Sequence, residues 1–218
     1  MAPRFCFGQI FHGYNMGTIG SAAEANLIIG GTHLVESALL PMFGKGVECE
    51  IQTGGSIREV LCTQLGVEND YLDNRIQTVF LNGRAVDDVD VARVVDGDIL
   101  ALSAAMPGLV GATMRKGGHY AAMREEISYT SDCNSAECTR GRIKIKLFNV
   151  LQKEIGLLFL MQGVRVLAED LKNGLLDAPG DFIEKCRSVT LNGERIDPKE
   201  VLEMNWTTEW VVLSVRRA

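Results

Sequence analysis

The chain has 218 residues, a formal net charge of −6 and a pI near 5.2, which argues against a general nucleic-acid binder because such affinity comes from neutralising phosphates. No run approaches the roughly 18 apolar residues that span a bilayer. The N-terminus also lacks the sustained apolar stretch of a signal peptide, so we expect a cytoplasmic protein with neither nucleic-acid nor membrane partners.

In chain order, residues 1–31 form an N-terminal extension rich in small residues, with a predicted helical stretch around Ala22 to Leu27. Residues 32–104 form a first domain. Its predicted elements are a strand at HLVESALLP, a turn at Gly44-Lys45-Gly46, a strand at VECEIQ, a helix from Ser56 to Leu65, and strands at TVFL and ILALS. Ser56 and Glu59 have capping-box spacing at the start of that helix, and Gly66 is a natural terminator.

Residues 105–141 form a Gly-rich connector, and residues 142–218 a second domain. In RIKIKLF, apolar residues alternate with Lys144 and Lys146, which predicts a half-buried strand. A turn ending at Gly156, a strand at LLFLMQ, a helix from about Val164 to Lys172 with a stop at Asn173-Gly174, and strands at SVTL and WVVLSV complete the expected order.

An internal repeat links the two domains. Leu81-Asn82-Gly83 recurs as Leu191-Asn192-Gly193, 110 residues later, and Asn-Gly tolerates the positive φ angles of a tight hairpin. The same offset places Gly46 on Gly156, Leu61 on Leu171 and Leu65 on Leu175, and the last strands match at an offset of 111. Self-similarity at a fixed offset predicts two copies of one folding unit.

The order of hairpin, helix, strand, Asn-Gly turn and closing strand is that of the β-grasp fold. IKIKLFNVLQKEIG in the second domain, with TVFLNGRAV and VVDGDILAL in the first, resembles the MoaD/ThiS-like family, which comprises the small subunit of molybdopterin synthase and the thiazole sulfur carrier. The resemblance covers about two-thirds of the chain and implies an α+β protein of two tandem β-grasp (ubiquitin-like) domains, although a fold alone does not imply a function.

In that family, function lies in a flexible tail that ends in Gly-Gly and is activated at its terminal carboxylate. After the last strand of the first domain, the chain reads AAMPGLVGATMRKGG, which makes Gly117 and Gly118 the candidate carrier tail. Another 100 residues follow Gly118, so a free carboxylate requires cleavage there, and the second domain ends in VRRA without Gly-Gly. The spacing of this Gly-rich stretch fits neither the P-loop nor the dinucleotide fingerprint.

Basic residues around the connector form a candidate docking patch for an acidic partner, or else an ordinary solvated face. The patch comprises Arg115, Lys116, Arg142, Lys144 and Lys146.

Cys133 and Cys138 have the spacing that begins a ferredoxin cluster motif, but Gly141 stands where the third cysteine is required. With His119 they also fall short of four zinc ligands, so we expect no metal and no cofactor. Whether these two thiols are paired, free or metal-bound stays open.

The sequence therefore favours a non-enzymatic binding or adaptor protein with a protein partner on its strand edges or its connector. A sulfur-carrier-like protein cleaved after Gly118 is one alternative. An enzyme with a site between the two domains is another.

Overall fold

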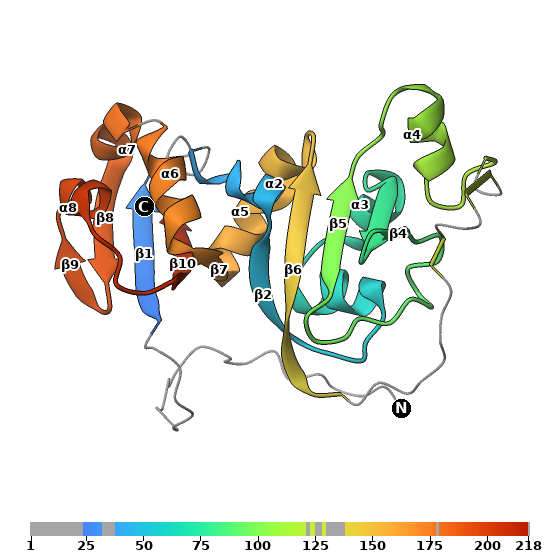
Figure 1. Cartoon of the computed structure of the whole chain (residues 1–218), viewed down its shortest axis with the longest axis horizontal. Coiled ribbons are helices and arrows are strands. Elements are labelled where there is room, and N and C mark those ends of the chain that lie inside the picture. Colours follow the sequence, from blue (N-terminus) through green and yellow to red (C-terminus); the bar gives the residue numbers. More distant parts are fainter. Residues whose placement is uncertain are drawn as a thin grey trace.

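The computed structural model describes residues 24–31, 38–120, 123–124, 128–129, 138–177 and 179–217. Within these ranges the protein is a mixed α/β structure with a single ten-stranded mixed sheet (Figure 1). No helix in the described part of the chain combines the length and the apolar character needed to cross a membrane.

The first half of the chain contributes five strands and the helices between them. In order these are β1 (Ala25–Gly31), α2 (Met42–Lys45), β2 (Val47–Gln52), the π-helix η1 (Glu59–Gln64), α3 (Asn69–Asn74), β3 (Thr78–Leu81), β4 (Arg84–Ala85) and β5 (Ile99–Ser103). Helix α4 (Gly108–Met114) then opens the connector.

The second half repeats this order of elements and adds one helix. It comprises β6 (Arg140–Phe148), α5 (Leu151–Gln162), β7 (Val164–Leu167), α6 (Ala168–Leu176), α7 (Pro179–Lys185), β8 (Cys186–Leu191), β9 (Glu194–Ile196), α8 (Pro198–Glu203) and β10 (Trp210–Arg217). Both halves therefore share one order: a strand, a helix, a strand, two helical segments and three strands. In the second half, the added helix α8 lies between the last two strands.

The sheet order, β4-β3-β5-β6-β2-β7-β10-β1-β8-β9, places two groups of five strands side by side, as Figure 1 shows. We call β4-β3-β5-β6-β2 the first unit and β7-β10-β1-β8-β9 the second unit. At the centre of each unit is a parallel pair, β5 with β6 and β10 with β1, flanked by antiparallel neighbours. One bridge, Glu48 opposite Arg165, joins the two units through β2 and β7.

One face of the whole sheet forms the core. Directly paired residues project to the same face, so the Glu48–Arg165 bridge aligns the faces of the two units. Alternate residues on the opposite face, such as Ile145 in β6 and Leu213 in β10, are fully buried and belong to one apolar cluster with the helices. Helix α5 contributes Phe159, whose ring centroid lies 6.0 Å from that of Phe43.

The two units exchange their first strands. β6 opens the second half of the chain, yet it pairs with β2 and β5 of the first unit. β1 opens the first half, yet it pairs with β8 and β10 of the second unit. Both strands therefore pair across the domain bounds expected from the sequence, 32–104 and 142–218, and β1 lies within the expected extension.

The two Asn-Gly turns occupy equivalent places and hold different strands. Asn82 and Asn192 have φ of 51° and 50°. In the first unit, Asn82 N donates to Ile99 O, and Ile99 N donates to Asn82 Oδ1 at 2.8 Å. In the second unit, Asn192 N donates to Asn26 O, and Asn26 N donates to Asn192 Oδ1 at 2.8 Å. β1 thus takes in the second unit the place that β5 takes in the first.

Several local predictions are confirmed. The strands at VECEIQ, TVFL and ILALS have the expected bounds, and Ile143, Ile145 and Leu147 alternate with less buried residues in β6. Ser56 and Glu59 form the capping box, with Ser56 N donating to Glu59 Oε2 and Glu59 N donating to Ser56 Oγ. Gly66, with φ of 72°, follows the helix as expected.

Other local predictions are wrong. LLFLMQ is the end of helix α5, with Gly156 inside that helix, because a short apolar run does not by itself distinguish a buried strand from a buried helix. β7 begins where a helix was expected, and α6 runs through Asn173-Gly174 to Leu176. The stretch expected to be helical near Ala22 is strand from Ala25 onward. Residues 33–37 of the expected HLVESALLP strand lie outside the described residues, and residues 38–41 form a short helical segment and a turn instead of a strand.

The offset of 110 also changes along the chain. Gly46 precedes β2 with φ of 111°, and its counterpart is Gly163, which precedes β7 with φ of 96°. From η1 and α6 onward the offset of 110 holds, since Leu61 in η1 and Leu171 in α6 are both buried. The predicted match of Gly46 with Gly156 is therefore wrong, because the loop between β2 and η1 has no counterpart between β7 and α6.

Candidate binding surface on the connector

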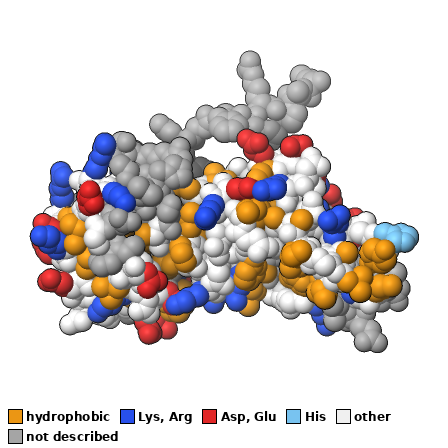
Figure 2. Space-filling model, turned by 90° about the horizontal axis from the view of Figure 1, so that it is seen from above, with side chains coloured by type: hydrophobic (Ala, Val, Ile, Leu, Met, Phe, Trp, Pro, Cys, Tyr) orange, Lys and Arg blue, Asp and Glu red, His pale blue; other side chains and the backbone are white. Residues whose placement is uncertain are grey.

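The connector carries the most exposed apolar side chains of the described chain. Leu109 and Val110 in α4 are each 68% exposed, and Met123 is 71% exposed. With Tyr120 they form what we call the connector patch. Figure 2 shows apolar side chains around the single coloured histidine at the end of the molecule where α4 lies. The His119 ring meets the Tyr120 ring edge-on, with centroids 5.2 Å apart.

Close backbone packing positions α4. A Cβ added at Gly111 would lie 1.9 Å from the carbonyl oxygen of Met106, far inside any allowed contact. Glycine therefore allows the helix to pack against the chain that leads into it. Leu109 and Val110 of the same helix remain exposed.

Lys116 fastens the end of the α4 segment to the first unit. Its backbone N donates to Gln77 O at 2.8 Å, and its Nζ donates to Leu72 O. Burial lowers the pKa of the Lys116 ammonium, with the neighbouring Asp73 carboxylate opposing that shift. Lys116 thus attaches the end of the α4 segment to the chain around Leu72 and Gln77.

Arg124 is a second residue that attaches the connector, and it is only 4% exposed. Its Nε donates to Thr113 O at 2.7 Å, and its Nη2 donates to Asp87 Oδ1 at 2.6 Å. The same Asp87 oxygen accepts from Gly117 N at 2.8 Å. One carboxylate in the loop after β4 therefore holds two points of the connector.

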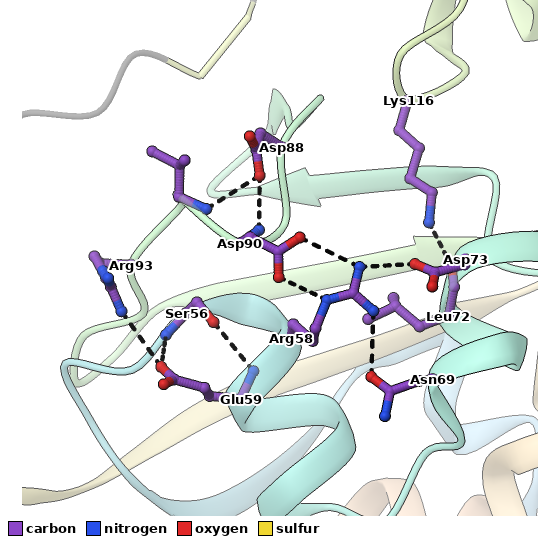
Figure 3. Close-up of polar contacts among 11 residues, drawn as sticks. Ser56, Arg58, Glu59, Asn69, Leu72, Asp73, Asp88, Asp90, Arg93 and Lys116 are labelled. Atoms are coloured by element: carbon purple, nitrogen blue, oxygen red, sulfur yellow. Dashed lines mark hydrogen bonds and ion pairs between the residues drawn. The ribbon is translucent and has the colours of Figure 1, made fainter.

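A shallow cavity of about 400 Å³ lies where the connector meets the first unit. Charged side chains dominate its lining: Arg58, Asp73, Asp87, Asp88, Asp90 and Lys116, together with Val89. Figure 3 shows Arg58 at the centre of a polar network that joins the helices to the loop at Asp88 and Asp90.

The donors of Arg58 are already used within the protein. Nε donates to Asp90 Oδ1 at 2.6 Å, Nη2 to Asp73 Oδ1 at 2.7 Å, and Nη1 to Asn69 Oδ1 at 3.2 Å. These hydrogen bonds raise the pKa of the guanidinium. Asp88 Oδ1 caps its own loop by accepting from Asp90 N at 2.8 Å (Figure 3). Three charged side chains of the cavity lining are thus hydrogen-bonded together, since Arg58 donates to both Asp73 and Asp90.

The carrier-tail residues predicted from the sequence lie in this braced region. Gly117 N donates to Asp87, as described above, and Gly118 N donates to Arg115 O at 3.1 Å. They follow α4, so helix and loop separate them from β5. In this structure Gly117 is hydrogen-bonded to the loop after β4, and Gly118 is hydrogen-bonded within the connector.

The five residues of the predicted basic patch do not lie together. Arg142, Lys144 and Lys146 project from β6 on the face away from the core, where Lys144 lies opposite Glu48 and Arg142 opposite Glu50. Lys116 reaches into the helical layer instead, and Arg115 is exposed beside it. The carboxylates of Glu48 and Glu50 form ion pairs with Arg165 and Arg140.

Cysteine and metal predictions are tested only in part. Cys133 lies outside the described residues, and Cys138 is an exposed free thiol. Cys49 is buried, which raises the pKa of its thiol to about 12. Within the described ranges, no group of three or more His, Cys, Asp or Glu side chains is placed to hold a metal ion.

Neither the connector patch nor the contacts through which Lys116 and Arg124 hold the connector in place were predicted from the sequence. The signal for the patch was present, since Leu109 and Val110 lie in a connector outside both copies of the repeat. The roles of Arg124 and Asp87 had no such signal, because their contact spans 37 residues and depends on tertiary packing.

Comparisons of the chain with protein-family models, with curated proteins and with solved structures gave no match. The candidate surface therefore rests on the geometry of the chain itself.

Proposed function

We propose that this chain is a non-enzymatic binding protein of two β-grasp-like units whose connector docks a protein partner. The observation that carries the proposal is the connector patch, in which Leu109, Val110, Tyr120 and Met123 are exposed on a braced base. Apolar side chains gathered at the surface are typical of interaction sites. Docking on a pre-organised surface also costs less ordering entropy than docking on a loose loop.

The exposed polar side chains beside the connector patch indicate which kind of partner surface would fit it. Arg115 and His119 are exposed beside it. An apolar partner surface with carboxylates on its rim fits this arrangement, because the rim charges then favour correct encounter.

The β-grasp part of the proposal draws support from strand arrangement. Each unit has two parallel central strands, antiparallel neighbours, an Asn-Gly hairpin and helices on one face. The exchange of first strands is a departure from a simple tandem. Descent from the MoaD/ThiS-like family stays part of the proposal.

The sulfur-carrier alternative has less support. A carrier tail must be free to enter the active site of another protein, whereas Gly117 and Gly118 are both hydrogen-bonded to the folded chain. A fragment ending at Gly118 would also lack β6, which lies between β2 and β5 of the first unit. Intact mass from native cells tests this alternative: a fragment ending at Gly118 with oxygen exchanged for sulfur would replace the binding proposal.

Site-specific photo-crosslinking in native cells tests the docking surface. A photo-reactive amino acid replaces either Val110 in the patch or Met161, which is 51% exposed in α5 and serves as the remote control. We expect one discrete crosslinked protein from position 110 and none from position 161. Equal products from both positions, or none from position 110, would contradict the proposal.

A matched pair of glycine variants separates the surface from general folding. Gly111→Ala displaces α4 from Met106 and should abolish the crosslink from position 110. Gly180→Ala makes the same change in helix α7, where the added Cβ meets nothing within 4 Å, and should leave the crosslink intact.

A further inference from the structure

The exchanged first strands have a consequence for how the chain holds together. We infer that the two halves of the chain are obligate partners: each half completes the other's unit, and they assemble even when the connector between them is cut. This inference is independent of the proposed partner on the connector patch, since it concerns only the pairing of β1 and β6.

The first unit depends on β6 for its centre. Ile145 lies opposite Val47 of β2 and beside Leu100 of β5, and all three side chains are fully buried. Without β6, the paired edges of β2 and β5 would both be open, and the apolar face between them would be exposed to water. The N-terminal half alone therefore lacks the middle of its own sheet.

The second unit depends on β1 in the same way. Leu27 lies opposite Leu213 of β10 and Leu191 of β8, and Leu27 and Leu213 are fully buried. β8 and β10 do not pair with each other in the sheet order, so β1 is what connects them. The C-terminal half alone would be split into two groups of strands.

Side-chain contacts between the halves add to this mutual dependence. Glu154 of α5 accepts from Tyr71 Oη at 2.6 Å and from Arg75 Nε at 2.8 Å. Gln162 Nε2 donates to Leu65 O at 2.8 Å. Helix α5 therefore binds the helical layer of the first unit, although it belongs to the second half of the chain.

A nicked full-length protein tests the inference. A recognition site for a sequence-specific protease is inserted between Asp132 and Cys133, and the purified chain is cut under native conditions. We expect the two fragments to co-elute at the position of the uncut 23.8 kDa protein and to melt in one cooperative transition. Fragments that separate during gel filtration would overturn the inference.

Reassembly in trans is the second arm. The fragments are separated in urea and diluted alone or together, and emission of Trp206 and Trp210 is followed. Both tryptophans are in the C-terminal fragment, whereas β1 is in the other fragment. Native emission should return only on mixing. Native emission and cooperative melting of the C-terminal fragment alone would refute mutual dependence.

Paired variants in β1 provide the control. Leu27→Asp in the N-terminal fragment places a charge at a fully buried position and should abolish recovery of tryptophan emission in its partner. Asn26→Asp alters the neighbouring exposed side chain and should leave recovery intact. Recovery with Leu27→Asp would show that β1 does not enter the second unit.

Discussion

At the scale of single residues, buried and half-buried ion pairs connect segments that are distant in the sequence. Arg124 joins the connector to the loop after β4, and Glu154 joins α5 to α3. Removing one partner from such a pair destabilises the fold, because the other charge then stays partly removed from water without its counter-charge. Two predictions follow from these two contacts.

Arg124→Ala should detach the connector from the first unit. The change leaves Thr113 O without its side-chain donor and Asp87 without its cation, and we expect the free energy of unfolding to fall by about 2 kcal/mol. Hydrogen exchange should become faster in α4, as mass spectrometry of the intact chain would report. Arg115→Ala, at an exposed side chain nearby, should change stability by no more than about 0.5 kcal/mol. Equal effects of the two variants would disprove the fastening role of Arg124.

Glu154→Gln should lower stability at neutral pH and lose its effect in acid. Hydrogen bonds from Arg75 and then Tyr71 hold the pKa of Glu154 at about 2, below its ordinary value of 4.5. A lowered pKa in the folded state stabilises the fold above the unfolded value, and that stability disappears as pH falls from about 4.5 through 2. Because the pair is partly exposed and screened by solvent, we expect a difference of about 1 kcal/mol at pH 7. Urea unfolding at pH 7 and pH 3 measures it, and a difference that grows in acid would contradict the assignment.

At the scale of elements, each Asn-Gly turn does more than reverse the chain. The Asn side chain accepts a hydrogen bond from the strand alongside, which is β5 in the first unit and β1 in the second. The turn thereby fixes the register of a strand that the hairpin does not contain. This explains why asparagine suits these positions: its side chain forms the clamp and its backbone tolerates φ near 50°.

Asn192→Gly should loosen β1 without straining the turn, because glycine adopts the same positive φ freely. Loss of the acceptor for Asn26 N should cost about 1 kcal/mol and accelerate exchange of the Asn26 amide by roughly tenfold. Nuclear magnetic resonance measures that amide directly. Asn82→Gly is the matched control: it should affect the Ile99 amide and leave Asn26 unchanged. An Asn26 amide that responds equally to both variants would rule out a local clamp.

At the scale of the whole molecule, two five-stranded units meet at a narrow seam. One bridge pairs β2 with β7, and Arg165 occupies it. Its guanidinium donates to Glu24 and Glu48 at 2.8 and 2.5 Å and lies 3.9 Å from the centre of the Trp210 ring. Each of these three partners comes from a different strand or strand end, so Arg165 ties both units and the start of β1 together.

Arg165→Met should weaken the seam. The variant keeps much of the apolar stem but leaves Glu24 and Glu48, which are only about one-fifth exposed, without their cation. We expect a loss of about 2 kcal/mol in urea unfolding monitored by tryptophan emission. The triple variant with Glu24→Gln and Glu48→Gln should recover part of that loss, because neutral amides cost less to leave unpaired. No recovery would point to packing of Arg165 on Trp210 as the larger contribution.

Local chemistry in the sequence predicted a large part of the fold. Capping at Ser56, the terminating Gly66 and the two Asn-Gly turns depend on neighbouring residues, so their signals lie within a few positions of the chain. The alternation in β6 could also be predicted from the sequence. Burial favours the apolar side chain of Ile145 but would cost the charged side chain of Lys144 its hydration. The repeat was detectable from Leu61 onward for the same reason: buried positions recur with the folding unit that buries them.

The connector was identified by sequence only as the part that the repeat does not explain. Its candidate surface needed three-dimensional information, because exposure of Val110 depends on what packs over it, and nothing in PGLVGATM distinguishes a covered helix from an exposed one. Likewise, the first five residues of LLFLMQ are apolar, and such a run fits a buried strand or a buried helix until its neighbours are known.

The sequence by itself determined the two Asn-Gly turns, the cap at Ser56 and most strands of this protein, because those depend on short-range backbone geometry and side-chain polarity. Tertiary structure alone decided that β1 enters the second unit and β6 the first. Both strands present alternating apolar residues that suit either sheet, so local preference does not choose between them. The choice is made by pairing over long sequence distances, where Asn192 holds Asn26 and Ile145 fills the space between Val47 and Leu100.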